Sequence, residues 1–137
     1  MPDSPITTWP VPGTLDAVLG FELVEASPEG ARARFEVVDQ VKQPLGLVHG
    51  GAYASLAESL TSATTYMAVA GDGNIATGQS NSTNFLRPIT SGTVHAEATP
   101  LHRGRSSWVW DVQFRDDDGR LCAVTRMTIA VRPARND

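Results

Sequence analysis

Residues 51–70, GAYASLAESLTSATTYMAVA, decide the fold. Their apolar side chains recur at the i, i+3 and i+4 spacing of an amphipathic helix. This stripe consists of Tyr53, Leu56, Ala57, Leu60, Ala63 and Met67. The only charged side chain among these residues is Glu58, although 19% of the whole chain is charged. A helix that faces solvent is seldom so poor in charge, so we expect the rest of the protein to cover this one on most sides.

Outside this helix, apolar and polar residues alternate as they do in half-buried strands. The predicted strands are residues 31–37, 75–86, 93–99, 106–114 and 121–131. Asp118-Gly119 separates the last two and predicts a hairpin turn between them. The segment 75–86 should end before Arg87-Pro88, because proline has no N–H for the ladder. One buried helix followed by four antiparallel strands predicts an α+β domain, with a sheet curled around a central helix.

Length and composition are those of one globular domain. The chain has 137 residues, of which 41% are hydrophobic. A chain of this length buries about two thirds of its unfolded surface, enough for a core without disulfides or metal. We expect an irregular N-terminal lead-in over residues 1–19 and a single domain over residues 20–137.

Several classes of protein are disfavoured. The longest apolar run, residues 66–70, is far shorter than the ~18 residues of a membrane helix, and the proline-rich N-terminus does not resemble a secretory signal. Cys122 is the single cysteine and cannot form an intramolecular disulfide, so the cytoplasm is the expected compartment. A net charge of −4 argues against a nucleic-acid partner.

Glu58 is the first candidate for chemistry. A lone carboxylate on a mostly buried helix needs a partner or a function, because burial disfavours its charged form. Ser62 lies four residues further on and therefore on the same face. Glu58 with Ser62 could form an oriented general base or nucleophile. A glutamate at a gap open to solvent is the alternative interpretation.

The loop before the helix supplies a second candidate group. His49-Gly50-Gly51 lies where the loop becomes the helix, and its glycines allow backbone or ligand to approach closely. The first N–H groups of a helix lack intrahelical partners and form a positive pole suited to an oxyanion. Gln43 lies upstream in the same loop and could polarise a carbonyl. An ordinary helix cap and an ordinary surface glutamine are the alternatives.

Other motifs do not support a function. Residues 78–82 (GQSNS) lack the second glycine of a nucleophile elbow, and residues 71–73 (GDG) follow a helix, unlike a dinucleotide-binding fingerprint. The three histidines lack metal-ligand spacing, so no metal site is predicted. Trp108 and Trp110 share one strand face and are expected in the core.

Short blocks along the chain carry a family resemblance. They are residues 46–51 (GLVHGG), 56–58 (LAE), 78–81 (GQSN), 85–88 (FLRP), 119–124 (GRLCAV) and 129–133 (IAVRP). In this order and spacing they resemble the hot-dog-fold acyl-CoA thioesterases, and more narrowly the 4-hydroxybenzoyl-CoA thioesterase of the Arthrobacter type. The resemblance implies a long antiparallel sheet around one helix, and hydrolysis of an aryl-CoA thioester to acid and CoA without metal or redox cofactor.

The resemblance also implies roles for single residues. Glu58 matches the catalytic carboxylate, Gly50 the main-chain N–H donor to the thioester oxygen, and Gln43 the polar residue that holds the carbonyl or the attacking water. Ser62 stands where that type has threonine, and the supporting hydroxyl is kept. His49 matches a histidine that lines the loop and orients it.

Four residues match positions expected near the CoA part of the substrate. Arg87, Ser106 and Arg135 match contacts to the CoA nucleotide and its phosphates. Arg105 departs from the small polar residue expected there and could add a phosphate contact or lie in solvent. The phenylacetyl-CoA thioesterases carry aspartate at the carboxylate position, so Glu58 favours the hydroxybenzoyl branch. The menaquinone-pathway thioesterases also carry glutamate there, and they stay open as an alternative.

Helix geometry bears on assembly. Gly50 and Glu58 are about 12 Å apart along the helix axis at a rise of 1.5 Å per residue, whereas one thioester needs both within roughly 3–3.5 Å of its reacting atoms. A homodimer can place Gly50 and Gln43 of one chain against Glu58 and Ser62 of the other, and the resemblance implies such dimers, often paired into a homotetramer. The alternatives to a thioesterase are a hot-dog hydratase or dehydratase that uses His49 with Glu58, and a non-catalytic acyl-CoA-binding module.

Overall fold

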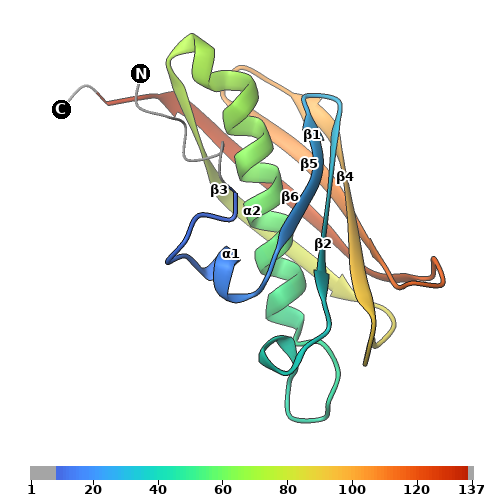
Figure 1. The fold of residues 1–137 in the computed structure, drawn as a ribbon. Helices are drawn as coiled ribbons and strands as arrows, with labels where there is room; N and C mark the ends of the chain where they lie inside the picture. Colours follow the sequence, from blue (N-terminus) through green and yellow to red (C-terminus); the bar gives the residue numbers. More distant parts are fainter. Residues whose placement is uncertain (1–8, 136–137) are drawn as a thin grey trace.

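The computed structural model describes residues 9–135, in which one long helix lies across a face of an antiparallel sheet (Figure 1). The helices are α1 (Leu15–Val18) and α2 (Gly50–Val69), with short 3-10 turns η1 (Asp39–Val41) and η2 (Ala70–Asp72). The strands are β1 (Glu22–Ser27), β2 (Gly30–Glu36), β3 (Asn74–Phe85), β4 (Thr93–Arg103), β5 (Ser107–Arg115) and β6 (Leu121–Pro133). The predicted α+β class and the central helix are confirmed.

The sheet has six strands in the order β1-β2-β4-β5-β6-β3, and all neighbours are antiparallel. Strands β4, β5 and β6 follow one another as hairpins, whereas β3 lies beyond β6 and pairs with it over almost all of its length. Strands β1 and β3 are therefore the two edges. Among the described residues, β3 has a neighbouring strand on one side alone.

The core lies between α2 and the sheet. Alternate residues of β5 point at the helix, and Trp108, Trp110, Val112 and Phe114 are all buried, as the alternation predicts. The indole Nε1 of Trp110 donates a hydrogen bond of 2.9 Å to Thr65 Oγ1. This bond joins the C-terminal half of the helix to an inner strand of the sheet.

The buried face of α2 differs from the predicted apolar stripe. Met67 is 47% exposed, whereas Thr61, Thr64 and Thr65 are buried. Each of these threonine hydroxyls donates to the carbonyl four residues earlier at 2.7 Å, so their burial leaves no hydroxyl unpaired. The spacing of apolar residues does not predict that these threonines are buried. The expectation that the rest of the protein covers α2 on most sides is confirmed, because only Gly51, Glu58 and Met67 of its 20 residues are exposed.

Two strands depart from their predicted form. β4 extends past its predicted end, because Pro100 sits at a register shift against β5, where its missing N–H costs no ladder bond. β1 was not predicted, since nearly all its residues are exposed and carry no apolar period. Its carboxylates pair with the next strand instead, Glu22 with Arg34 and Glu25 with Arg32.

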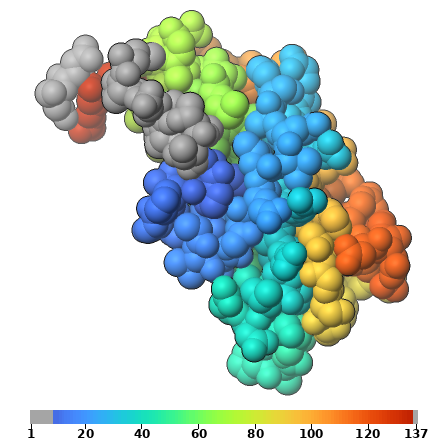
Figure 2. Space-filling model, viewed as in Figure 1, coloured from blue at the N-terminus to red at the C-terminus, as the bar shows by residue number. Residues whose placement is uncertain are grey.

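The lead-in is irregular except for α1, a single turn capped by the hydroxyl of Thr14. Asp16 of this turn accepts hydrogen bonds from Trp9 Nε1 at 2.9 Å and from Ser59 Oγ of α2 at 2.5 Å. Figure 2 shows the dark-blue lead-in lying against this side of the molecule. Residues 1–8 of the predicted lead-in lie outside the described residues.

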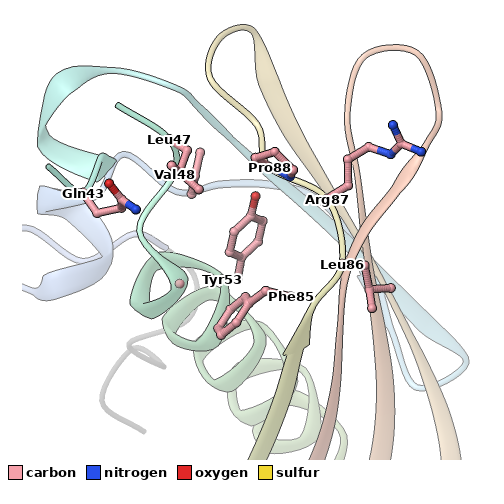
Figure 3. Close-up of a pocket in the computed structure, with 9 residues that line it drawn as sticks. Gln43, Leu47, Val48, Tyr53, Phe85, Leu86, Arg87 and Pro88 are labelled. Atoms are coloured by element: carbon pink, nitrogen blue, oxygen red, sulfur yellow. The ribbon is translucent and has the colours of Figure 1, made fainter. Parts of the chain in front are cut away.

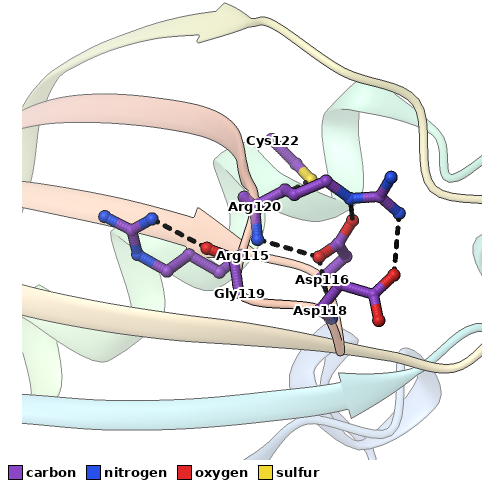
Figure 4. Close-up of polar contacts among 6 residues, drawn as sticks. All are labelled: Arg115, Asp116, Asp118, Gly119, Arg120 and Cys122. Carbon is purple, nitrogen blue, oxygen red and sulfur yellow. Dashed lines mark hydrogen bonds and ion pairs between the residues drawn. The ribbon is translucent and has the colours of Figure 1, made fainter.

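The predicted turn between β5 and β6 is confirmed (Figure 4). One carboxylate oxygen of Asp116 accepts the N–H groups of Asp118 and Arg120 at 3.0 and 2.9 Å, and the other accepts Arg120 Nε at 2.7 Å. Gly119 has φ of +78°, a left-handed conformation that favours glycine.

Candidate active site at the start of helix α2

Helix α2 begins at Gly50, and His49 holds its first turn. The Nδ1 atom of His49 accepts the Gly51 N–H at 2.8 Å. This caps one of the N–H groups that have no partner inside the helix. The Gly50 N–H makes no hydrogen bond to another described residue, so the donor that the sequence singled out is open to a ligand.

Gln43 is fixed by a tight loop between η1 and α2. The Gln43 N–H donates to the carbonyl of Leu47, and its own carbonyl accepts the Gly46 N–H, both at 2.9 Å. Gly46 has φ of +87°, which lets the loop close. The side-chain oxygen of Gln43 accepts the Leu45 N–H. The amide nitrogen remains as a donor and points to the cavity side in Figure 3.

A cavity of about 540 Å³ lies beside this loop and the start of α2. Its lining consists of Gln43, Leu47, Val48, Gly50, Tyr53, Phe85, Leu86, Arg87 and Pro88. Three predicted site residues, Gln43, Gly50 and Arg87, therefore meet here. Figure 3 shows the guanidinium of Arg87 turned outward rather than into the cavity.

Two aromatic rings that sequence reasoning did not assign to the site form one wall of the cavity. Tyr53 of α2 and Phe85, the last residue of β3, have ring centroids 6.0 Å apart. The Phe85 ring lies directly over Gly50, where an added Cβ would come within 2.6 Å of Phe85 Cζ. Helical periodicity predicted that Tyr53 is buried, but no local pattern shows that its hydroxyl or the Phe85 ring faces a cavity.

Glu58 lies away from this cavity and is exposed in the single chain. Its side chain rests on Gly78 of β3, where an added Cβ would stand 3.1 Å from Glu58 Cγ. Asn81 Nδ2 donates to the Ala54 carbonyl at 2.9 Å and holds β3 against the helix nearby. The expectation of a buried carboxylate is therefore wrong for one chain, because this face of α2 adjoins the free edge of the sheet.

Ser62 lies one turn beyond Glu58, on the same face of α2. Its Oγ atom is buried, yet it makes no hydrogen bond to any described residue, Glu58 included. A buried polar atom without a partner is uncommon and calls for an explanation.

The candidate groups thus form two clusters on one helix. Gly50 and Gln43 line the cavity, whereas Glu58 and Ser62 lie beside the free edge of β3. Gly50 and Glu58 are eight positions apart, which corresponds to about 12 Å along the helix axis. One chain does not bring both clusters to a single carbonyl.

A family model decides the class of the protein. The model of the thioesterase superfamily matches residues 45–123, more than half of the chain. The chain belongs to this superfamily. It is therefore a thioester hydrolase by class, and the six-stranded sheet around α2 is the hot-dog fold that the resemblance implied.

Relatives of this thioesterase span most of its length. The proofreading thioesterase EntH of Cronobacter turicensis is 37% identical over 119 residues, 87% of this chain and 86% of that protein. The 1,4-dihydroxy-2-naphthoyl-CoA hydrolase of Escherichia coli (strain K12) is 33% identical over 119 residues, 87% of each protein. A solved Pseudomonas aeruginosa thioesterase, a glutamine-to-alanine mutant, has a TM-score of 0.85 and 35% identity, and the match covers 89% of this chain and 88% of that one.

The residues that the resemblance places near CoA lie at two ends of the sheet. Arg87 lines the cavity, and its N–H donates to the carbonyl of Cys122 at the start of β6. The remaining three are exposed at the opposite end and are Arg105, Ser106 and Arg135. The Ser106 carbonyl accepts the N–H of Val131 near the end of β6, roughly 30 Å from Cys122 at 3.3 Å per residue. A single chain does not gather all four around one nucleotide.

Other side chains capable of chemistry have structural roles. His95 Nε2 lies 2.8 Å from Asp117 Oδ1 on the surface of the sheet. Cys122 is buried, and this burial raises the pKa of its thiol. Within residues 9–135, no group of three or more His, Cys, Asp or Glu could hold a metal ion, and no helix is long and apolar enough to cross a membrane.

Proposed function

We propose that this thioesterase hydrolyses an aromatic acyl-CoA, such as 4-hydroxybenzoyl-CoA, to the free acid and CoA. The observation that carries the proposal is the cavity at the start of α2, where the Gly50 N–H and Gln43 stand beside the rings of Tyr53 and Phe85. A mostly apolar cavity with a few polar groups suits a flat aromatic ring that must be oriented. The relative named as a dihydroxynaphthoyl-CoA hydrolase supports an aromatic substrate.

In this proposal, the thioester carbonyl points at the N-terminus of α2. The Gly50 N–H donates to the carbonyl oxygen as negative charge develops on it, aided by the positive end of the helix dipole. One such donor contributes about 3–4 kcal/mol to the transition state. The amide nitrogen of Gln43 holds the same carbonyl or the attacking water.

Glu58 supplies the other half of the chemistry. It either attacks the carbonyl carbon, forming a mixed anhydride that water then cleaves, or it takes a proton from water as the water oxygen attacks. In both routes the C–S bond breaks, CoA leaves with its electron pair and takes up a proton, and the aromatic acid is released. The Ser62 hydroxyl supports the carboxylate.

The separation of the two clusters requires Glu58 to come from a second copy of the chain. Glu58 stands beside the free edge of β3, and such an edge offers unpaired backbone groups for a partner strand. A two-fold dimer then holds two equal sites, each with Gly50 and Gln43 from one chain and Glu58 and Ser62 from the other. The proposal includes a homotetramer built from two such dimers.

The role of Glu58 is tested by Glu58→Ala. We expect kcat to fall by at least ~100-fold, the usual size of the effect of losing a general base or nucleophile, while the fold stays intact by circular dichroism. Glu97→Ala, which removes an exposed carboxylate on β4, is the matched control and should keep full activity. A Glu58→Ala enzyme that retains most of its turnover removes Glu58 from the mechanism.

The shared site is tested by mixing two variants, Glu58→Ala and Gln43→Ala, each nearly inactive alone. Random exchange of chains makes about half of the dimers hybrids, and each hybrid has one intact site of two. Roughly a quarter of the wild-type activity should return by this symmetry argument. If mass spectrometry verifies exchange and no activity returns, the shared site is wrong.

The acyl group is tested by thiol release from a panel of aryl- and alkyl-CoA esters. We expect kcat/KM to be highest for aryl esters, and a preference for alkyl esters contradicts the aromatic assignment. Rapid hydration of an enoyl-CoA would favour a hydratase. Stabilisation by CoA esters without any thiol release would favour a binding module.

A further inference from the structure

Tyr53 occupies a fixed position at the cavity. It lies three residues after Gly50, on the same side of α2. Its side chain is 4% exposed and packs against three phenylalanine rings, with centroids 6.3 Å away for Phe35, 6.0 Å for Phe85 and 5.3 Å for Phe114. Rings on several sides leave little freedom for rotation, and the hydroxyl points into the cavity (Figure 3).

The Tyr53 hydroxyl has no hydrogen-bond partner among the described residues. Buried tyrosine hydroxyls usually find one, so an unpaired one that faces a cavity is suited to a ligand. Burial raises the pKa of Tyr53 to about 12, with a smaller contribution from Cys122. The hydroxyl therefore stays protonated near neutral pH and can donate a hydrogen bond.

The other polar groups of the cavity either serve the thioester carbonyl or point away from the cavity, unlike the Tyr53 hydroxyl. The Gly50 N–H and Gln43 serve the thioester carbonyl in the proposed function, and Arg87 points outward in Figure 3. The other side chains of the lining are apolar: Leu47, Val48, Phe85, Leu86 and Pro88. Within this apolar part of the described lining, Tyr53 is the one side chain that can donate a hydrogen bond to an oxygen atom on a bound acyl group.

We infer that the Tyr53 hydroxyl determines acyl specificity by donating a hydrogen bond to an oxygen substituent on the aromatic ring of the substrate. The inference rests on the proposed function and deepens it by naming the residue that recognises the oxygen on the ring. A ring that carries the oxygen gains this bond, whereas an unsubstituted ring covers the hydroxyl without giving it a partner. Loss of a hydrogen-bonded oxygen is the kind of difference that a pocket can discriminate strongly.

The test compares wild type, Tyr53→Phe and Tyr66→Phe with benzoyl-CoA and its 2-, 3- and 4-hydroxy isomers. Tyr53→Phe removes one oxygen that bonds no described residue, so the fold should be kept, which thermal unfolding checks. Tyr66→Phe makes the same change in the same helix outside the cavity and is the matched control. The readout is the ratio of kcat/KM for the isomer that wild type prefers to kcat/KM for benzoyl-CoA.

We expect this ratio to fall by roughly 5- to 100-fold in Tyr53→Phe, the range expected when a buried polar group loses its partner, and to stay at the wild-type value in Tyr66→Phe. A ratio unchanged by Tyr53→Phe overturns the inference and leaves the proposed function standing. An equal loss for all four esters also overturns it, since the hydroxyl would then serve the shared carbonyl. A wild type that hydrolyses none of them overturns the proposed function and the inference together.

Discussion

Replacing Ser62 by alanine should stabilise the protein while it weakens catalysis. The Ser62 Oγ is buried and unpaired among the described residues, a position where a hydroxyl is costly to the fold. The alanine variant removes that oxygen, leaves the helix backbone unchanged and keeps the residue small. The fold therefore gains what the hydroxyl costs it, and the proposed site loses the group that supports Glu58.

The magnitude follows from two contributions. Alanine is favoured over serine inside a helix by about 0.5 kcal/mol. Leaving a buried hydroxyl unpaired costs about 1–3 kcal/mol, part of which is recovered when the oxygen is removed. Together they predict that Ser62→Ala raises the free energy of unfolding by about 1–2 kcal/mol. For a domain of this size, this corresponds to a Tm increase of roughly 3–10 °C.

Ser59→Ala is the matched control, because Ser59 lies on the same helix and its hydroxyl is paired. Its Oγ donates to Asp16 at 2.5 Å. A hydrogen bond to a charged group contributes about 1.5–3 kcal/mol, which exceeds the gain in helix propensity. The same serine-to-alanine change should therefore lower the free energy of unfolding by about 1–2 kcal/mol at this position.

Urea unfolding followed by circular dichroism measures both variants, and thiol release measures kcat. We expect opposite signs for the two changes in stability and a fall in kcat for Ser62→Ala. If Ser62→Ala is destabilised by more than about 0.5 kcal/mol, a typical limit for a neutral substitution, the hydroxyl is paired in the assembled protein and the argument from its burial fails. Equal changes in the free energy of unfolding for Ser62→Ala and Ser59→Ala also refute the argument from burial.

Three further predictions concern binding, the core and pH. Arg87→Ala should raise KM much more than it lowers kcat, and steady-state kinetics at about 50 and 500 mM salt should show the effect shrinking as the charge is screened. Trp110→Phe should lower the free energy of unfolding by about 2–4 kcal/mol in urea titrations, because it leaves a void and removes the bond to Thr65. The hydrogen bond from His95 lowers the pKa of Asp117 below its ordinary 3.8, so the carboxylate stabilises the fold above that pH and ceases to do so as pH falls through the lowered value. Between about pH 5 and 2, wild type should therefore lose more stability than Asp117→Asn, and parallel losses in urea titrations would contradict this.

Most of the fold was predictable because its periodic signals are local. The alternation in residues 31–37 and 106–114 matches β2 and β5 closely, and Gly119 marks the turn after β5. Strand order was not predictable in the same way. The pairing of β3 with β6 is a contact between segments far apart in the sequence, and no periodicity within β3 encodes its neighbour.

Single residues of the candidate site could be predicted from the sequence, but their arrangement in space could not. The helix start at Gly50 and the preceding loop were marked by glycines, whose conformational freedom is a property of single residues. Tyr53 and Phe85 join that site through packing between α2 and the end of β3. Such packing depends on tertiary structure, so the sequence showed Tyr53 as a member of an apolar stripe and nothing more.

The sequence and the single chain disagree most at Glu58, and a second copy accounts for the disagreement. The helix carries one charge, as a covered helix would, yet Glu58 is exposed in the single chain and lies against β3, which has a neighbouring strand on one side alone among the described residues. A partner placed along β3 would cover that face and supply a neighbour for the strand. The same partner would present its own Gly50 to Glu58, which one helix cannot do over about 12 Å. The charge-poor helix, the free edge and the divided site thus have one common explanation in the proposed dimer.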